Sequence, residues 1–245
     1  MAHQTALLKG ELYLRPAAGG PLVSTGNNTK ITLSQEVEEK LIPFMKGVGG
    51  GNHDKFSRAK SVKLAIAMRE LSLQNAKLIF GADVAVLPAA AVADESHVDV
   101  KVGGLVPLDR RQDLSMPLVV KKAATTLDEG VDYRRVRAGL IVLANGALAD
   151  GDDINASYNA LASMKVNGLV QTAQEFYGYF DGINERNGKP LVFEFWRPVF
   201  GPAKSIELLG DDFLTLDVEA DCLADSSRPV GESPFYRGDI AGLFE

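Results

Sequence analysis

The sequence predicts a mainly β protein. Its 245 residues include 24 glycines and 11 prolines, which is a loop-rich composition. Short runs of alternating apolar and polar residues recur along the chain, as strands require. Hydrophobic residues make up 46% and charged residues 24%, which is ordinary for a globular protein and argues against disorder. The formal net charge of −6 argues against general nucleic-acid binding, because affinity for phosphate needs clustered cations.

The N-terminal quarter is expected to form two strands and a loop. Residues 6–14 predict the first strand, which ends in a turn rich in Pro and Gly. Residues 31–41 alternate between apolar and polar side chains and favour a half-buried strand. The Glu and Lys content of residues 34–45 also suits a helix. Glycines concentrated in residues 47–51 predict a long mobile loop over 43–57.

A strand over 62–69 and one short helix are expected next. Ser72 suits an N-cap and Gly81 suits the residue after a helix, so we expect a helix over about 72–81. The Ala- and Val-rich residues that follow predict a linker or an extended crossover. Several short strands separated by Gly and Asp turns mark residues 82–160 as a candidate inserted, hairpin-rich lobe.

The C-terminal third predicts strands followed by an arm. The expected strands cover residues 165–173, 175–181, 191–200 and 213–223. The tail over 225–245 contains Pro229 and Pro234 and is expected to be an extended arm rather than a packed element. The sequence therefore predicts a main β domain over 1–224 and this arm.

No catalytic or metal-binding pattern stands out. Cys222 is the single cysteine and alternates with apolar residues, which indicates a buried, unreactive thiol. The other candidates are His53, Asp54, His97 and Asp99 for a metal, and Asp211 with Asp212 for hydrolysis. The metal candidates lack the spacing of a metal site and the aspartates are typical of turns. We expect no enzymatic activity, no cofactor and no metal.

An aromatic cluster is expected to lie in the core of a sheet. Its members are Phe176, Tyr177, Tyr179, Phe180, Phe193, Phe195 and Trp196. An alternative is a platform on which sugars or a peptide bind, because amphipathic aromatic rings stack on sugar faces. The exposure of Trp196 separates the two interpretations.

Acidic residues dominate the stretch from Ser205 to Ser227, which contains no Lys or Arg. Within it, Thr215, Asp217, Glu219 and Asp221 share one face of a strand, and apolar residues occupy the other face. Like charges along one strand repel each other. Two interpretations stay open: a solvated outer face, or the wall of a water-filled lumen that repels passing nucleic acid.

The order of motifs in residues 175–225 is characteristic. An aromatic strand with glycines (176–182) precedes an Asn-Gly-Lys turn (187–189), a stretch ending in Phe-Gly-Pro (192–202) and Leu-Leu-Gly-Asp-Asp-Phe (208–213). This order resembles the C-terminal part of the tail tube proteins, or major tail proteins, of long-tailed bacteriophages. Residues 62–81 resemble the strand and short helix of that fold.

The resemblance implies a β-sandwich or β-barrel with one flanking helix, and a structural role in the virion. Such proteins self-assemble into hexameric rings that stack into the tail tube, through which the genome is ejected. The partners implied are copies of the chain, the tape measure protein and the tail terminator; DNA passes without being bound, and no membrane is involved. The implied location is the virion tail, after assembly in the host cytoplasm.

The resemblance also suggests roles for residues. The lumen-facing acidic strand is Thr215, Asp217, Glu219 and Asp221; ring-stacking candidates are Lys46, Gly49, Gly50, Asn52 and His53; arm candidates are Pro229, Phe235 and Tyr236. The alternative from a different class is a monomeric β-sandwich that binds carbohydrate or peptide through Trp196, Tyr177 and Tyr179.

Overall fold

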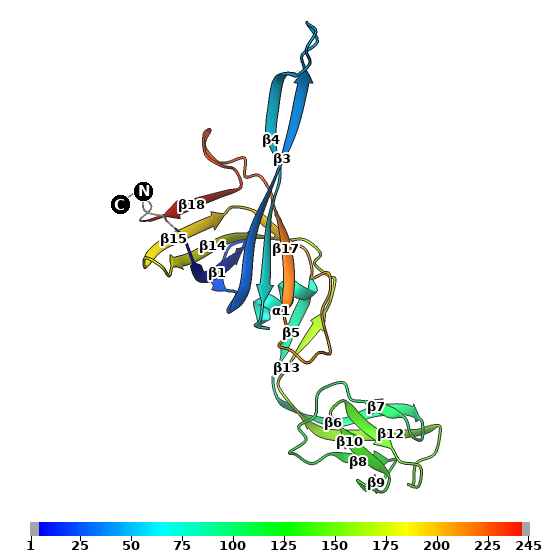
Figure 1. Ribbon diagram of the computed structural model, residues 1–245. Helices are drawn as coiled ribbons and strands as arrows, with labels where there is room; N and C mark the ends of the chain where they lie inside the picture. The colour runs from blue at the N-terminus through cyan, green and yellow to red at the C-terminus, as the bar shows by residue number, and fades with distance from the viewer. Residues whose placement is uncertain (1–4, 242–245) are drawn as a thin grey trace. The chain divides into compact units, whose positions relative to one another are not determined.

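The computed structural model describes residues 5–241 and is mainly β, with antiparallel sheets and one α-helix in that range (Figure 1). The predicted fold class is confirmed. The chain divides into two compact units. Unit 1 combines the chain up to Val84 with the chain from Val166 onward, and unit 2 is Ala85–Lys165. Unit 2 corresponds to the lobe expected over 82–160.

Unit 1 contains a 9-stranded sheet in its described part. Its elements are β1 (Leu8–Pro16), β2 (Val23–Ser24), β3 (Asn28–Pro43), β4 (Asn52–Met68), α1 (Leu73–Phe80), β14 (Gln174–Asn184), β15 (Lys189–Phe195), β16 (Pro198–Phe200), β17 (Leu216–Cys222) and β18 (Tyr236–Ile240). The strand order is β18-β15-β14-β16-β17-β4-β3, with β1 on β14 and β2 on β1. Because the order ends at β3 and at β18, the described sheet does not close into a barrel.

The sheet folds over on itself where β15 gives way to β16. Gly178 of β14 pairs with Phe195, whereas Glu175 pairs with Val199. One extra residue therefore lies between the two pairings, which is a β-bulge that bends the strand. The result is two layers, one of β1, β14, β15 and β18 and one of β3, β4, β16 and β17.

The core of unit 1 lies between these layers. Leu12 and Phe195 from the first layer belong to one buried cluster with Leu64 and Val218 from the second. Burial alternates along β4 from Val62 onward and along the whole of β17, as the period-two pattern predicts. The core-facing side of the second layer is therefore specified by simple alternation.

Helix α1 confirms the prediction over 72–81. The hydroxyl of Ser72 accepts the backbone N–H of Asn75 at 3.2 Å, and Gly81 adopts the left-handed conformation at φ 53° that ends the helix. Leu78 and Ile79 are buried in the sandwich core. The short helix is held by this packing, since eight residues are too few for stability by propensity.

Unit 2 has its own core and two small sheets. Its strands are β6 (Ala90–Val100), β7 (Leu105–Pro107), β8 (Val119–Lys122), β9 (Thr125–Leu127), β10 (Tyr133–Val136), β11 (Gly139–Val142) and β12 (Asp152–Ala160). They form the sheets β6-β12-β8-β9 and β10-β11-β7 around a cluster that includes Val120, Tyr133 and Ile154. Where the chain enters and leaves this unit, β5 (Asp83–Leu87) pairs with β13 (Ser163–Asn167).

Several boundaries differ from the sequence expectations. The loop expected over 43–57 covers only residues 44–51, because β3 and β4 continue as a long hairpin, and the helix considered over 34–45 is wrong. The strand expected over 165–173 stops at Asn167, and the one expected over 213–223 begins at Leu216. The strand expected over 191–200 is broken by the bulge.

The C-terminal arm is also corrected. Residues Tyr236–Ile240 form β18, which pairs with β15 along five residues from Phe195↔Tyr236 to Leu191↔Ile240. Backbone pairing at an open edge of the sheet fixes this part of the tail. The last residues of the expected arm, 242–245, lie outside the described range.

Candidate functional site

The outer half of the β3–β4 hairpin has no packing partner in the described chain. β17 pairs with β4 only between Lys63 and Met68, so residues 36–61 pair only with each other. Figure 1 shows the hairpin extending beyond the sheet of unit 1. Its large apolar side chains are 41–110% exposed: Val37, Leu41, Ile42, Phe44, Met45, Val48 and Phe56. This density of exposed apolar groups is typical of a surface that another protein covers.

Ion pairs connect the two strands of this outer half. Glu36 contacts Lys60, Glu38 contacts Arg58 and Glu39 contacts Lys55, each at 2.6 Å. The hydrogen bond from Lys60 lowers the pKa of the exposed Glu36 carboxyl. Exposed ion pairs contribute little to stability, because water and salt screen the charges. They are therefore a weak support for a two-stranded ribbon, which is marginally stable by itself.

The tip of the hairpin carries part of the predicted ring-stacking set. Lys46, Gly49 and Gly50 lie in the turn, whereas Asn52 and His53 are the first residues of β4 and not of a loop. The backbone N–H of Phe44 donates to the carbonyl of Gly51 at 2.8 Å and closes the turn. Residues Gly49–Gly51 all have positive φ values, which explains the run of glycines. The run of glycines that predicted a long loop therefore forms the turn at the tip of the hairpin.

The acidic strand lies on the outer face of the second layer. Asp217, Glu219 and Asp221 are exposed, and the alternate residues of β17 are buried. Thr215 is exposed and immediately precedes the first residue of β17. Cross-strand pairing places Ala67 beside Asp217 and Ala65 beside Glu219, so small side chains separate the acids from β3.

The acids are less isolated than the run without Lys or Arg suggests. Lys63 of β4 lies 3.6 Å from Asp221, and Lys204 lies 2.5 Å from Glu219. The hydrogen bond from Lys204 lowers the pKa of Glu219. Local sequence does not reveal Lys63, because the strand that carries it is far away along the chain. The face is therefore mixed in charge and not uniformly negative.

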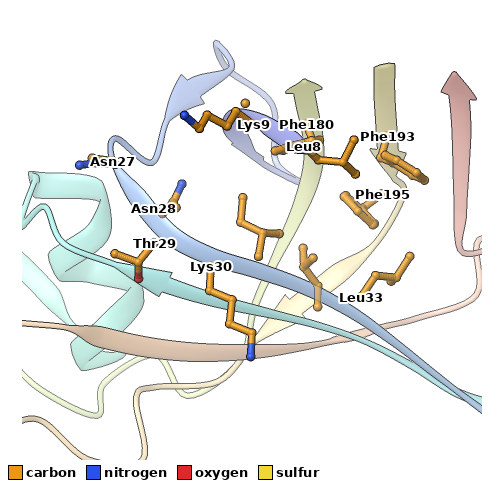
Figure 2. A pocket seen from close by; sticks show the side chains of 13 residues that line it. Leu8, Lys9, Asn27, Asn28, Thr29, Lys30, Leu33, Phe180, Phe193 and Phe195 are labelled. Carbon is orange, nitrogen blue, oxygen red and sulfur yellow. The ribbon is translucent and has the colours of Figure 1, made fainter. Parts of the chain in front are cut away.

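A groove opens between β1 and β3, and sequence reasoning missed it. Its volume is about 750 Å³. Figure 2 shows Phe180, Phe193 and Phe195 on one side of the groove and Leu33 of β3 on the other. Lys9 and Lys30 lie at its rim. The groove marks the place where the two layers remain open beside the unpaired edge of β3. A short stretch of sequence does not predict such a groove, because the groove forms where two strands, β1 and β3, do not pair with each other.

The aromatic cluster does not form an exposed platform. Trp196 is only 7% exposed, and its Nε1–H donates to the carbonyl of Ser233 at 3.1 Å. Arg228 covers its ring, with the guanidinium carbon 3.7 Å from the ring centroid. Tyr177 donates its hydroxyl proton to Glu194 at 2.9 Å, and burial raises the pKa of that phenol to about 12. The contacts of Trp196 with Ser233 and Arg228 hold the tail against the sheet.

The arm candidates divide between packing and exposure. Phe235 and Tyr236 pack against the core of unit 1, and the Tyr236 ring lies 6.3 Å from that of Phe195. Pro229 is exposed. The tail from Ser233 to Ile240 therefore belongs to the sandwich and covers Trp196.

The remaining chemical candidates are dispersed. Cys222 is buried, as predicted, and burial raises the pKa of its thiol to about 11. His97 lies in β6 with its Nε2 3.0 Å from Glu95, while His53 and Asp54 lie in β4. Within residues 5–241, no three His, Cys, Asp or Glu side chains gather as metal ligands. Over the same range, no helix has the length and apolar character that crossing a membrane requires.

Comparison with known families places the chain in one of them. A family model covers residues 5–238, and the chain belongs to that family, which is described as protein of unknown function UCP028589. None of the curated proteins matches the sequence.

Proposed function

We propose that the protein is a structural subunit that assembles with copies of itself into rings, which stack into a hollow tube like the tail tube of a long-tailed bacteriophage. The observation that carries the proposal is the outer half of the β3–β4 hairpin, whose apolar side chains have no partner in the described chain. Burial against another copy would supply the stabilisation that an isolated hairpin lacks. The order of motifs in the C-terminal third supports the same proposal.

Lateral association uses the open side of the sandwich. The long edge of β3 has no described strand beside it other than β4. An unpaired edge of this length is a ready template for another strand. The groove beside it has aromatic walls that a neighbouring copy would cover. Joining edges around a ring removes the exposed edges and gives a closed, head-to-tail assembly.

The outer face of β3, β4 and β17 is the proposed wall of the lumen. Its side chains are small or charged, and Asp217, Glu219 and Asp221 are countered by few lysines. A face without large apolar or clustered basic groups gives DNA little to bind during passage. In this proposal the protein resides in the virion tail, has no catalytic role, and meets a tape measure protein and a tail terminator at the tube.

A separate experiment tests whether Asp217, Glu219 and Asp221 line the lumen. In tubes of a variant with Asp217→Lys, Glu219→Lys and Asp221→Lys, subunit contacts are retained and the wall becomes basic. We expect such tubes to retain DNA at low salt, with affinity that falls steeply as salt rises, whereas wild-type tubes retain little. Equal retention by both would remove these residues from the lumen.

The binding-module alternative has less support. It requires Trp196 and its neighbours to be accessible, but Arg228 and the tail cover that ring. A sugar would have to displace a cation–π contact and a packed strand before reaching the indole. No observation on the described chain favours this function over assembly.

The test of assembly is direct. Purified protein is examined at rising concentration by negative-stain electron microscopy and sedimentation velocity. We expect rings or tubes for the wild type and none for Val37→Asp/Phe56→Asp, which places two charges on the exposed hairpin.

The matched control is Val131→Asp, which alters a similarly exposed apolar residue of unit 2. This variant should assemble like the wild type. A wild-type protein that stays monomeric at every concentration would overturn the proposal.

A further inference from the structure

A second apolar site lies at the other end of strand β4. It is a hollow of about 350 Å³ beside the start of β17. Leu71, Phe80 and Leu216 contribute to its lining, together with residues of the irregular segment that precedes β17. Three side chains of that segment are 80–92% exposed: Leu208, Leu209 and Phe213. An exposed apolar group of this kind beside an open hollow marks a surface for a partner.

Two acidic residues line part of this hollow, and the guanidinium carbon of Arg69 lies 5.9 Å from the ring centroid of Phe213 on its wall. Glu207 and Asp212 are among its lining residues, and Asp211 lies next to them in the chain. Between residues 205 and 214 the sequence contains no Lys or Arg. A partner that carries apolar side chains and a positive charge would therefore match the site in both respects.

The tip of the hairpin has these properties. Between residues 43 and 51 it presents Phe44, Met45 and Val48, with Lys46 as the single charged residue in that range. The hollow has more than twice the roughly 150 Å³ that accommodates a benzene ring in a protein cavity, so two apolar side chains fit inside. The groove between β1 and β3 suits the tip less, because its described lining residues include no Asp or Glu that could pair with Lys46.

Tip and hollow lie at opposite ends of one strand. β4 begins at Asn52 beside the tip and ends at Met68, which pairs with Leu216 at the hollow. At a rise of about 3.3 Å per residue, the two sites are on the order of 50 Å apart. A tip therefore cannot reach the hollow of its own chain. Complementary sites at the two ends of one strand produce a head-to-tail contact that repeats along the strand direction.

We infer that the hollow lined by Leu71, Phe80 and Leu216 receives the hairpin tip of a second copy of this chain. Met45 and Val48 of one copy enter the hollow of the next, and Lys46 lies against Glu207, Asp211 and Asp212. The inference rests on the proposed self-assembly and assigns its stacking contact, with the receiving site on this chain.

The test uses two variants that are each defective on one side. The tip variant is Met45→Asp/Val48→Asp, and the receiving variant is Leu209→Asp/Phe213→Asp; all four residues are exposed, so the fold should persist. Thermal unfolding checks the fold, and Leu105→Asp in unit 2 is the matched control with an exposed apolar residue. We expect each variant alone to form rings that do not stack.

Mixing the two variants separates this contact from any other. The intact tip of the receiving variant still fits the intact hollow of the tip variant, so the mixture should form stacks that stop at two layers. A charge exchange sharpens the test. Lys46→Glu should weaken stacking about tenfold or more, and Asp212→Lys in the same chain should restore much of it.

The outcomes distinguish the two claims. If the receiving variant stacks into tubes like the wild type, the hollow is not the stacking site, while self-assembly stands. If the mixture gives no paired layers, the head-to-tail contact is wrong. If the wild type forms neither rings nor tubes, the proposed function fails and the stacking inference fails with it.

Discussion

The two halves of the β3–β4 hairpin share the same strands but differ in what holds them. The inner half, where β4 pairs with β17, buries Val62, Leu64, Ile66 and Met68 in the sandwich core. The outer half is two-stranded, and its apolar residues Val37, Leu41, Ile42 and Phe56 are exposed. The same two strands thus belong to the folded core at one end and are exposed, with no third strand beside them in the described chain, at the other.

The two halves of the hairpin serve different purposes in this proposal: the inner half stabilises the fold, and the outer half mediates assembly. In the inner half, strict alternation directs one face to the core, and burial stabilises the monomer. In the outer half, charged pairs such as Glu38–Arg58 keep the hairpin paired without burying it. Substitutions in the inner half should therefore act on the free energy of unfolding, and those in the outer half on association.

The largest effect is expected at the centre of the inner half. Leu64 is 0% exposed, so Leu64→Ala leaves a cavity between the layers. We expect the free energy of unfolding to fall by about 2–5 kcal/mol, measured by urea denaturation with tryptophan fluorescence. Trp196 reports on the same unit. A loss below about 1 kcal/mol would mean that this half is not part of the core.

The next effect tests how the base of the hairpin is anchored. Asn75 of α1 is buried, and its side-chain amide donates to the carbonyls of Thr25 at 2.9 Å and Glu70 at 2.8 Å. Asn75→Ala leaves both carbonyls without this donor, at a cost of roughly 1–3 kcal/mol. Urea denaturation measures the cost, and Lys77→Ala, at an exposed position of the same helix, is the control. Equal stability of both variants would contradict an anchoring role.

A smaller effect on monomer stability is expected in the outer half. Phe56 is 57% exposed, so Phe56→Ser should change the free energy of unfolding by less than about 0.5 kcal/mol. The same substitution should reduce ring or tube formation in sedimentation experiments, because it removes apolar area from the proposed interface. If Phe56→Ser destabilised the monomer but left assembly normal, the outer half of the hairpin would contribute to the fold and not to association.

Much of the fold could be predicted from local patterns. Alternation predicted β17 and the inner part of β4, and Ser72 with Gly81 bounded α1, because these features depend on neighbouring residues. The extent of the hairpin was missed, since glycines at the tip outweighed the weaker alternation beside it. Strand β18 was missed because an edge strand is specified by an available partner edge and not by its own pattern.

The candidate site was predicted only in part. The exposed face with Asp217, Glu219 and Asp221 follows from alternation. The partners Lys63 and Lys204 do not, because they come from other segments of the chain. The groove between β1 and β3 and the hollow beside β17 arise where distant segments leave space, which no short stretch of sequence encodes.

The smallest effect concerns pH and separates the two halves once more. The pKa of Glu36 is lowered by the hydrogen bond and charge of Lys60, so this pair stabilises the outer hairpin above the unfolded pKa of Glu, near 4.3. The contribution is lost as the pH falls from there through the folded pKa. Amide hydrogen exchange of residues 36–61 should therefore accelerate below about pH 4 relative to the rate expected for exposed amides, while the amides of Leu64 and Ile66 stay protected. Glu36→Gln keeps the shape of the side chain and should reduce this pH dependence, while the pairs Glu38–Arg58 and Glu39–Lys55 remain. An unchanged pH profile in that variant would show that Glu36 does not hold the ribbon together.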